Sequence, residues 1–512
     1  MHPKETTMFR WKRLVAVAAV VALGLTGCSA SPSDSGGSAG TLTIGGIVQA
    51  STFAAAQSNW ANESPYMQAV YDTILTADTK GEVQPGLATK WEYNEDKTVL
   101  TLTLRDDVKF TDGTALDAEA VAQNLVRFRD GAGPNASYLV DMTDAVATDA
   151  KTVTITLKAA NPALLTYLTQ NAGLVEAPSA FDSADIQTVP VGSGPYTLDT
   201  AATVIGTSYV FNKNPDYWKP ENQHYDKIVM NVYTDPTALL NAVKGGQVNA
   251  TNTVNNNDIA QMEASGFTSN PLELNWAGLT LMDRDGTVDP ALSNVKVRQA
   301  INYAFDKDAM LKTVENGFGT PTTQVFPERS AAYDKSLDSA YDYDPAKAKE
   351  LLAEAGYADG VTIQMPSSPL LGASTFTLIQ QQLADVGITV EYGEPGNNFI
   401  ADVLTPKYPV VYIPLQQGGD WELIQFLISP TATFNPYHTS DDTVNGYIAT
   451  VQNGTEEESA QAAKDLNKYL VDNAWFAPWY RTQSTYMTDA NTSVVMQPGN
   501  AVPYLWNITP KA

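Results

Sequence analysis

The chain has 512 residues, of which 43% are hydrophobic, and a formal net charge of −26. A globular chain of this length exceeds what one hydrophobic core usually holds, so the composition predicts two or more domains. This net negative charge argues against binding to nucleic acid and against direct adsorption to an anionic membrane, and its even spread along the sequence indicates mainly a role in solubility.

Residues 1–27 have the pattern of a bacterial secretory signal peptide. Basic residues precede an apolar run over 14–25, which is too short to remain as a membrane-spanning helix. The run ends in Leu-Thr-Gly-Cys, which resembles a lipobox, the motif whose Cys receives a diacylglycerol and becomes the first residue after cleavage. Cys28 is the only Cys of the sequence, and lipidation accounts for a lone thiol in an exported protein. The alternative is an ordinary signal peptide with a chance Cys.

The segment after the Cys is rich in Ser, Gly and Pro. We predict that residues 28–40 form a flexible tether and that the folded part begins near Thr41. No later apolar run is long enough to cross a membrane. We therefore expect a protein that is held by its lipid at the extracytoplasmic face of the cell membrane.

Strands and helices alternate irregularly over residues 76–190. Leu alternates with Thr over 98–104, and apolar residues alternate with Thr over 152–157, which is the period of a half-buried strand. Residues 116–128, between these strands, have the pattern of a helix that ends near Gly131. The segment therefore predicts a small α+β domain.

A turn rich in Gly and Pro follows at residues 190–196. Its Gly residues permit backbone angles that other residues resist, and we expect the chain to cross between domains here.

The second half of the sequence predicts mainly helices. Asn or Ser and Asp-Pro supply start signals, and Gly supplies stop signals. Helices are predicted over 236–243, from Ser293 or Asn294 to Phe305, from Asp344 to Gly356, from Phe376 to Gly387 and over 456–471, with a strand over 388–391.

The residues that commonly serve catalysis are scarce. The sequence has three His, at positions 2, 224 and 438, and the first is lost with the signal peptide, so no His-based metal site is expected. No zinc-peptidase, P-loop or serine-hydrolase motif is present. Asp283 to Asp289 resemble a calcium loop faintly, but a polar surface turn is favoured. We expect no catalytic residue, no metal and no cofactor.

Five segments, in order, resemble the extracellular solute-binding proteins that serve ABC importers for peptides, nickel and related solutes (family five). Together they cover most of residues 41–480. They are Tyr-Asp-Thr-Ile-Leu at 71–75 with Gly-Glu-Val-Gln-Pro-Gly-Leu-Ala at 81–88, Thr-Leu-Thr-Leu-Arg-Asp-Asp-Val-Lys-Phe at 101–110, Gly-Ser-Gly-Pro-Tyr at 192–196 with Asn-Pro-Asp-Tyr-Trp at 214–218, Val-Lys-Val-Arg-Gln-Ala-Ile-Asn-Tyr-Ala-Phe-Asp-Lys at 295–307, and Tyr-Asp-Pro-Ala-Lys-Ala at 343–348 with Leu-Leu-Ala-Glu-Ala-Gly at 351–356.

The resemblance implies an α/β, two-lobed periplasmic-binding-protein-like fold of class II. Two lobes would be joined by a two-stranded hinge and close over the ligand. The implied boundaries are 41–75, 191–272 and 486–512 for lobe one, 76–190 for an inserted small α+β domain, and 273–485 for lobe two.

The resemblance also implies a function. The protein would capture a small solute between its lobes, a peptide in the first instance, and deliver it as a monomer to the permease and ATPase subunits of an ABC importer. Oligosaccharides, opines and metal chelates stay open as ligands. A secreted lipoprotein hydrolase, such as a glycosidase with paired carboxylates, and a surface receptor with the same fold are the alternatives.

Candidate ligand residues follow from the same resemblance. In peptide-binding relatives, an Asp near a Trp in lobe two meets the amino terminus of the peptide. The matching region here, residues 410–436, departs from the sequence motif that is usual in those relatives. The candidates are Trp276, Gln416, Gln417, Asp420, Trp421, Asn435, Trp479, Tyr480 and Arg481.

Each candidate has a structural alternative. The Trp residues could serve core packing, and Asp420 could be a solvated loop residue. Arg481 could hold a ligand carboxylate or form a salt bridge between the lobes. For Arg298, which lies in the fourth matched segment, pairing with a carboxylate and capping of main-chain carbonyls are both open.

Overall fold

The computed structural model describes residues 39–511 except 254, 395–398 and 501. The predicted signal peptide, the lipidation site Cys28 and nearly all of the tether lie outside the described residues. Residues 39–512 form one compact unit. Among the residues described, no helix has both the length and the apolar character needed to cross a membrane.

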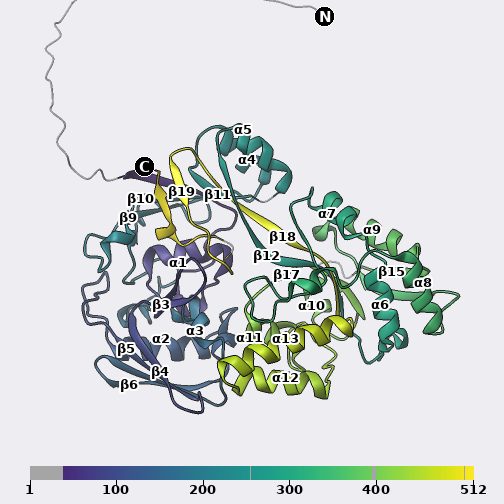
Figure 1. Cartoon of the computed structure of the whole chain (residues 1–512). Helices are drawn as coiled ribbons and strands as arrows, with labels where there is room; N and C mark the ends of the chain where they lie inside the picture. Colours follow the sequence, from purple (N-terminus) through teal and green to yellow (C-terminus); the bar gives the residue numbers. More distant parts are fainter. Residues whose placement is uncertain (1–38, 254, 395–398, 501, 512) are drawn as a thin grey trace, which may run out of the picture. The chain divides into compact units, whose positions relative to one another are not determined.

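The largest sheet has the strand order β16-β12-β18-β11-β1-β10-β9-β8, with β13 beside β18 and β17 beside β12 (Figure 1). β1 pairs in parallel with β10 and β11, and the other pairings in the sheet are antiparallel. The strands are β1 (Ala39–Gly46), β8 (Tyr196–Leu198), β9 (Ser208–Lys213), β10 (Tyr225–Val232), β11 (Ala250–Asn252), β12 (Thr268–Leu281), β13 (Gly319–Pro321), β16 (Val410–Tyr412), β17 (Leu415–Gln416) and β18 (Phe476–Thr488).

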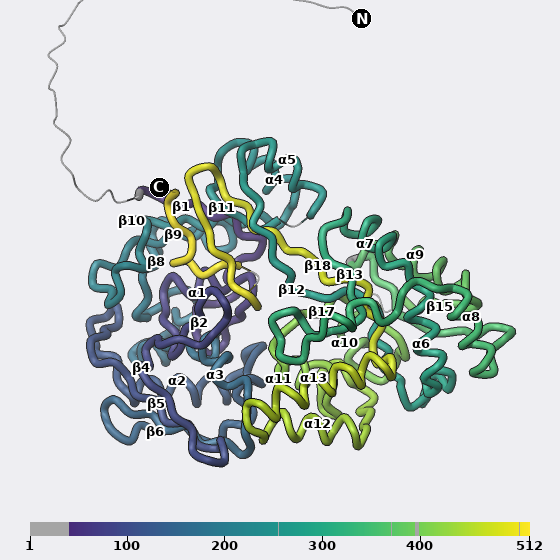
Figure 2. Tube along the Cα trace, viewed as in Figure 1, coloured from purple at the N-terminus to yellow at the C-terminus, as the bar shows by residue number. Residues whose placement is uncertain are grey.

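Two long strands, β12 and β18, run through the centre of this sheet. They pair with each other from Thr268 with Thr488 to Thr280 with Phe476. At one end β18 also pairs with β11, and at the other end β12 pairs with β16 and β17. Figure 2 shows their traces side by side between the region of β1 and β11 and the region of α6 to α9. The two strands therefore connect both halves of the sheet.

The pairing of β12 with β18 is interrupted by bulges. The register shifts between Glu273 and Asn275, which leaves Leu274 as an extra residue on β12. A second shift leaves Trp479 as an extra residue on β18. Because a bulge bends a strand and re-aims its side chains, β12 and β18 each change direction locally at these positions.

A four-stranded antiparallel sheet, β4-β5-β7-β6, forms a separate layer that helix α2 covers (Figure 1). The strands predicted over 98–104 and 152–157 and the helix between them are confirmed. Asp117 caps the helix by accepting a hydrogen bond from the Ala120 N–H at 2.9 Å. The elements here are α1 (Ser64–Val70), β2 (Leu75–Ala77), β3 (Val83–Pro85), β4 (Ala88–Tyr93), β5 (Val99–Leu104), α2 (Ala118–Asp130), β6 (Met142–Asp149), β7 (Thr152–Leu157) and α3 (Leu164–Tyr167).

The helices predicted in the second half are confirmed, including their start signals. Asn294 and Asp344 cap their helices as predicted, and Thr455 with Glu458 forms a capping box that was not predicted. The elements are α4 (Pro236–Lys244), α5 (Ile259–Ala264), α6 (Val295–Tyr303), α7 (Lys307–Val314), α8 (Pro345–Glu354), β14 (Val361–Pro366), α9 (Ala373–Ala384), β15 (Ile388–Gly393), α10 (Phe399–Val403), α11 (Asp420–Leu423), a π-turn (Ile424–Ile428), α12 (Asp442–Asn453), α13 (Glu456–Asp472), β19 (Thr492–Val494) and β20 (Ile508–Pro510).

The Gly-rich turn at 190–196 is present, but its glycines are needed for a different reason from the one predicted. Gly192 and Gly194 do not have a left-handed backbone. A Cβ at Gly192 would lie 2.1 Å from the Val70 carbonyl oxygen, and one at Gly194 would lie 2.4 Å from the Val70 carbonyl carbon. Close approach of two backbones, rather than unusual backbone angles, excludes larger residues here.

The region around α2 packs against the region around α12 and α13. The largest cluster of buried apolar side chains includes Leu125 and Phe128 from the first region and Leu466 and Leu470 from the second. Two hydrogen bonds of 2.8 Å join the regions, from Lys97 Nζ to the Gly454 carbonyl and from Gln452 Nε2 to the Ala160 carbonyl.

Candidate functional site

A cavity of about 350 Å³ lies against the middle of β12 and β18. Its volume falls at the lower end of the range for small-molecule sites, about 300–1,000 Å³. Segments that are far apart in the sequence line it: Ile47, Asn59, Trp60, Ala61, Asn62, Asn135, Tyr138, Gln170, Asn252, Thr253, Leu274, Asn275, Gln416, Ser484 and Gly499.

The bulge on β12 builds one wall of this cavity. Leu274, the extra residue, accepts a hydrogen bond from the Gln417 N–H at 2.8 Å through its carbonyl oxygen. The next residue, Asn275, is the direct cross-strand partner of Gln416 on β17. Because directly opposed residues of adjacent strands carry their side chains on the same face, the two amides lie next to each other.

Residues 59–62 build another wall. The Asn59 Oδ1 accepts a hydrogen bond from the Trp60 N–H at 2.9 Å, and the Trp60 indole N–H donates to Asn500 Oδ1 at 3.2 Å. Ala61 has a left-handed backbone, with φ of 41°. This conformation costs an Ala roughly 1–2 kcal/mol, and such strain in native proteins tends to lie at functional sites.

The lining is uncharged and rich in amide groups. Seven of the fifteen residues are Asn or Gln, and none is Asp, Glu, Lys, Arg or His. Trp60 and Tyr138 add aromatic surface, and Tyr138 is held by stacking on Tyr167 at 4.1 Å between ring centroids. The cavity can therefore donate and accept many neutral hydrogen bonds.

Charged groups lie behind this lining and have partners in the protein. Glu63 accepts hydrogen bonds at 2.7 Å from the Ser51 N–H and hydroxyl. Burial raises the pKa of Glu422, whose Oε2 accepts a hydrogen bond from the Gly419 N–H at 2.6 Å. Burial, and secondarily the charge of Glu422, raise the pKa of Tyr138 to about 12, so the phenol is neutral at physiological pH.

Only Gln416 of the sequence-predicted candidates lines the cavity. Gln417 follows it but is buried, and its Nε2 donates to the Val325 carbonyl at 2.8 Å. Trp421 is buried as well. Trp276 is fully buried with its ring edge-on to Phe476, at 5.7 Å between centroids.

The candidates on β18 are buried in the core. Trp479 and Tyr480 are fully buried, and Trp479 stacks on Tyr412 at 5.3 Å between centroids. Arg481 is 1% exposed and forms ion pairs with Glu273 at 2.8 Å, Asp338 at 2.9 Å and Glu328 at 3.3 Å. Its guanidinium group is thus engaged by carboxylates of the protein itself.

Asp420 and Asn435 hold main-chain segments in place. The Asp420 carboxylate accepts hydrogen bonds from the Ser330 hydroxyl and from the Ala332 N–H, and burial raises its pKa. Asn435 is fully buried, and its Nδ2 donates at 3.0 Å to the carbonyl oxygens of Ser429 and Thr439.

Two further expectations are decided by these contacts. Arg298 donates to the carbonyl oxygens of Leu292 at 2.7 Å and Asn473 at 2.9 Å, so the carbonyl-capping alternative is correct. Asp283 begins a turn, but the prediction of a surface turn is wrong for this residue. Its side chain is fully buried and accepts hydrogen bonds from three main-chain N–H groups at 2.7 Å.

Among the residues described, no cluster of three or more potential metal ligands occurs.

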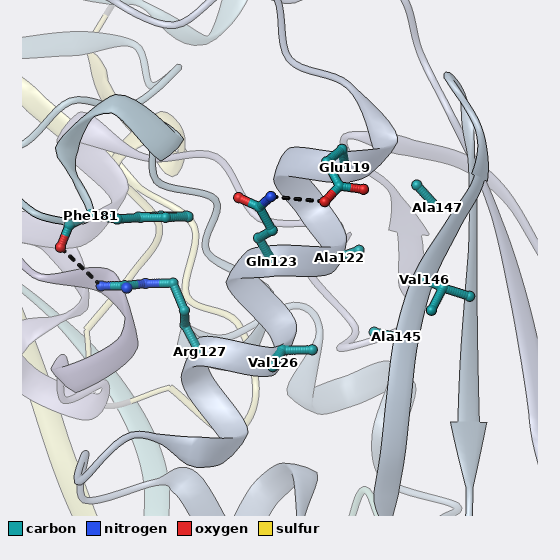
Figure 3. Close-up of a pocket in the computed structure, with 9 residues that line it drawn as sticks. All are labelled: Glu119, Ala122, Gln123, Val126, Arg127, Ala145, Val146, Ala147 and Phe181. Atoms are coloured by element: carbon teal, nitrogen blue, oxygen red, sulfur yellow. Dashed lines mark hydrogen bonds between the residues drawn. The ribbon is translucent and has the colours of Figure 1, made fainter.

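A second hollow of about 540 Å³ lies between α2 and β6 (Figure 3). Gln123 donates to Glu119 at 2.8 Å, and the Arg127 guanidinium lies 4.1 Å from the centroid of the Phe181 ring. All residues lining this hollow come from 119–181, whereas those of the first cavity come from the whole unit.

Most cavity residues were not among the sequence predictions. Asn59, Asn62, Asn252 and Asn275 belong to separate segments that only the tertiary structure brings together. The one signal in the sequence is the unusual density of Asn over 252–257, at the end of β11 and before α5.

The comparisons with known proteins give the family. The model of the bacterial extracellular solute-binding proteins, family 5 (middle part), matches residues 82–443. The chain is similar to the glutathione-binding protein GsiB of Escherichia coli O1:K1, with 32% identity over 354 residues, which are 65% of this chain and 67% of GsiB.

Solved structures share the fold. HbpA2 from Haemophilus parasuis has a TM-score of 0.82 at 23% identity, over 92% of this chain and 100% of its own. DppA from Helicobacter pylori, a periplasmic binding protein associated with an ABC transporter, was solved with the peptide STSA and has a TM-score of 0.76 at 20% identity, over 92% of this chain and 98% of its own. The predicted two-lobed α/β fold is confirmed. The chain belongs to family 5 of the bacterial extracellular solute-binding proteins, which deliver their ligands to ABC importers.

Proposed function

We propose that the cavity on β12 and β18 is where this solute-binding protein captures its ligand. The supporting observation is that its lining draws on all three proposed domains. Residues 59–62 belong to lobe one (41–75, 191–272 and 486–512), residues 135–170 to the inserted domain (76–190), and residues 274–416 to lobe two (273–485). A ligand that touches all three favours the closed arrangement by its differential affinity for it.

The hinge in this proposal is the β12–β18 pair. The bulge at Leu274 lies directly beside the cavity, so flexing of the strands there changes the distance between the walls. Closure would bury the ligand and present one surface to a permease.

Binding without chemical conversion fits this cavity better than hydrolysis does. A glycosidase needs two carboxyl groups that flank the scissile bond. None of the fifteen described residues in the lining has a carboxyl, thiol or imidazole group. We therefore propose a binding protein rather than an enzyme.

The anchor in this proposal is a lipid on Cys28, with the mature protein on the extracytoplasmic face and acting as a monomer. The test expresses the full chain in a lipoprotein-processing host and partitions it between detergent and aqueous phases. The wild-type protein is expected in the detergent phase and Cys28→Ser in the aqueous phase. Equal partitioning of both would contradict lipidation.

A peptide is the first expectation for the ligand, since DppA was solved with a peptide and GsiB is named for binding glutathione. Amide side chains can bond peptide groups, but the cavity's uncharged lining also suits a neutral sugar. The experiment is a thermal-stability screen of the mature protein, because a ligand at 100 times its Kd stabilises the native state by about 2.7 kcal/mol. A stabilising compound recovered intact supports the proposal, and one that is consumed refutes it in favour of an enzyme.

A further inference from the structure

We infer that the part of the ligand seated in the cavity is a short, neutral oligosaccharide. This inference rests on the proposed function and names the substrate class of that same cavity. Three features carry it: the charge of the lining, the state of its amide groups, and its aromatic rings.

The first feature is the absence of charge in the described lining. A free peptide carries an ammonium and a carboxylate group, and opines and many chelates carry carboxylates. Burying such a charge without a partner costs several kcal/mol. Although 17% of the chain's residues are charged, none of the fifteen that line the cavity is.

Two charged groups near the lining, Glu63 and Arg481, have charged or hydrogen-bonding partners within the protein. Both carboxylate oxygens of Glu63 accept hydrogen bonds, from Ser51 and from Asn59. Arg329 donates to the Gln417 carbonyl, and Arg481 is surrounded by three carboxylates. Glu63 and Arg481 therefore offer a charged ligand no free partner, whereas the exposed Arg329 makes only this one hydrogen bond among the residues described.

The second feature is the set of amides whose hydrogen-bonding groups face the cavity unused. The side chains of Gln170, Asn275 and Gln416 make no hydrogen bond to any described residue. Each amide offers both a carbonyl acceptor and N–H donors, and a sugar hydroxyl is likewise both donor and acceptor. The adjacent pair Asn275 and Gln416 can therefore bond two neighbouring hydroxyls.

The third feature is the half-buried aromatic side chain of Tyr138, since Trp60 also lines the cavity but is only 5% exposed. A sugar ring has an apolar face of C–H groups that packs on an aromatic ring. The Tyr138 ring is fixed by its stacking on Tyr167. Fixed rings lose little entropy when a ligand binds.

The test compares three panels on the mature protein by thermal shift and calorimetry: neutral trisaccharides of glucose, galactose, mannose and xylose in both anomeric linkages, zwitterionic trialanine, and N-acetyl-trialanine amide. Binding from the sugar panel alone, with an affinity that is unchanged between low and high salt, is the expected result. Binding of either peptide would overturn the inference and leave the proposed function standing. No binding from any panel would overturn both.

Two variants locate the binding. Asn275→Leu and Gln416→Leu are each expected to weaken sugar affinity about tenfold or more, because a ligand hydroxyl is left unbonded. Gln381→Leu, on the exposed surface of α9, is the matched control and is expected to leave affinity unchanged. Equal affinity in wild type and both cavity variants would overturn the assignment to this cavity.

Discussion

Arg481 offers a sharp test of whether a candidate residue serves stability or ligand binding. Its guanidinium group is 1% exposed and contacts the carboxylates of Glu273, Asp338 and Glu328. Burial alone would lower its pKa, but the carboxylates of Asp338 and Glu273 reverse the effect and raise it. The network extends further, because Asp338 also accepts hydrogen bonds from Thr322 at 2.7 Å and from Tyr333 at 2.6 Å.

We predict that Arg481→Met lowers the free energy of unfolding by about 3–5 kcal/mol, since removing one partner of a buried ion pair leaves uncompensated charge. The pair with Glu328 contributes little, because that side chain is 65% exposed. Adding Asp338→Asn to Arg481→Met is expected to restore part of the loss, since the pair is then removed together. Urea denaturation followed by tryptophan fluorescence measures both variants.

The control is Lys468→Met, whose ion pair with Asp472 is exposed and whose loss is expected to cost at most about 0.5 kcal/mol. Ligand affinity of Arg481→Met should stay near the wild-type value once the protein is folded. An unchanged urea midpoint together with a large loss of affinity would refute this reasoning and return Arg481 to the ligand site.

Two other substitutions test the packing and the titration of the fold. Gly194→Ala is expected to lower the free energy of unfolding by about 1–3 kcal/mol, since its Cβ would lie 2.4 Å from the Val70 carbonyl carbon. Gly446→Ala on α12 has open space around the new Cβ and should raise the free energy of unfolding by up to about 1 kcal/mol. Equal changes in the stability of the two variants would contradict the close approach of the backbones at Gly194 and Val70. Burial raises the pKa of Glu176 from 4.5 to about 7, so its contribution to stability is present below about pH 4.5 and is lost as the pH rises through 7. Glu176→Gln should flatten the dependence of unfolding free energy on pH between about 4.5 and 7. An unchanged pH dependence would show that the titration of Glu176 does not cause it.

The sequence was informative where structure depends on local signals. Asp344-Pro345 and Thr455 with Glu458 start helices at the predicted places because a cap bonds main-chain N–H groups of its own first turn. The alternation over 98–104 likewise reports one buried face of a strand. The family resemblance supplied the two-lobed arrangement, which no local pattern contains.

The cavity was largely beyond sequence reasoning. The bulge at Leu274 results from the pairing of two strands about 200 residues apart, and nothing near Leu274 signals it. Asn275 lies beside Gln416 because of the register between β12 and β17. Asn59, which also lines the cavity, belongs to a segment near the N-terminus. Conversely, Trp276, Trp479 and Tyr480 are typical binding-site residues by type but are fully buried. Exposure to the cavity is a tertiary property.

Equilibrium dialysis with chemical recovery of the ligand tests the central proposal most directly, using the compound that stabilises the wild-type protein in the screen. We predict one molecule bound per chain, recovered unaltered, and binding that is lost when Asn275→Leu and Gln416→Leu are combined. A converted ligand, or full binding by the double variant, would contradict solute capture in this cavity.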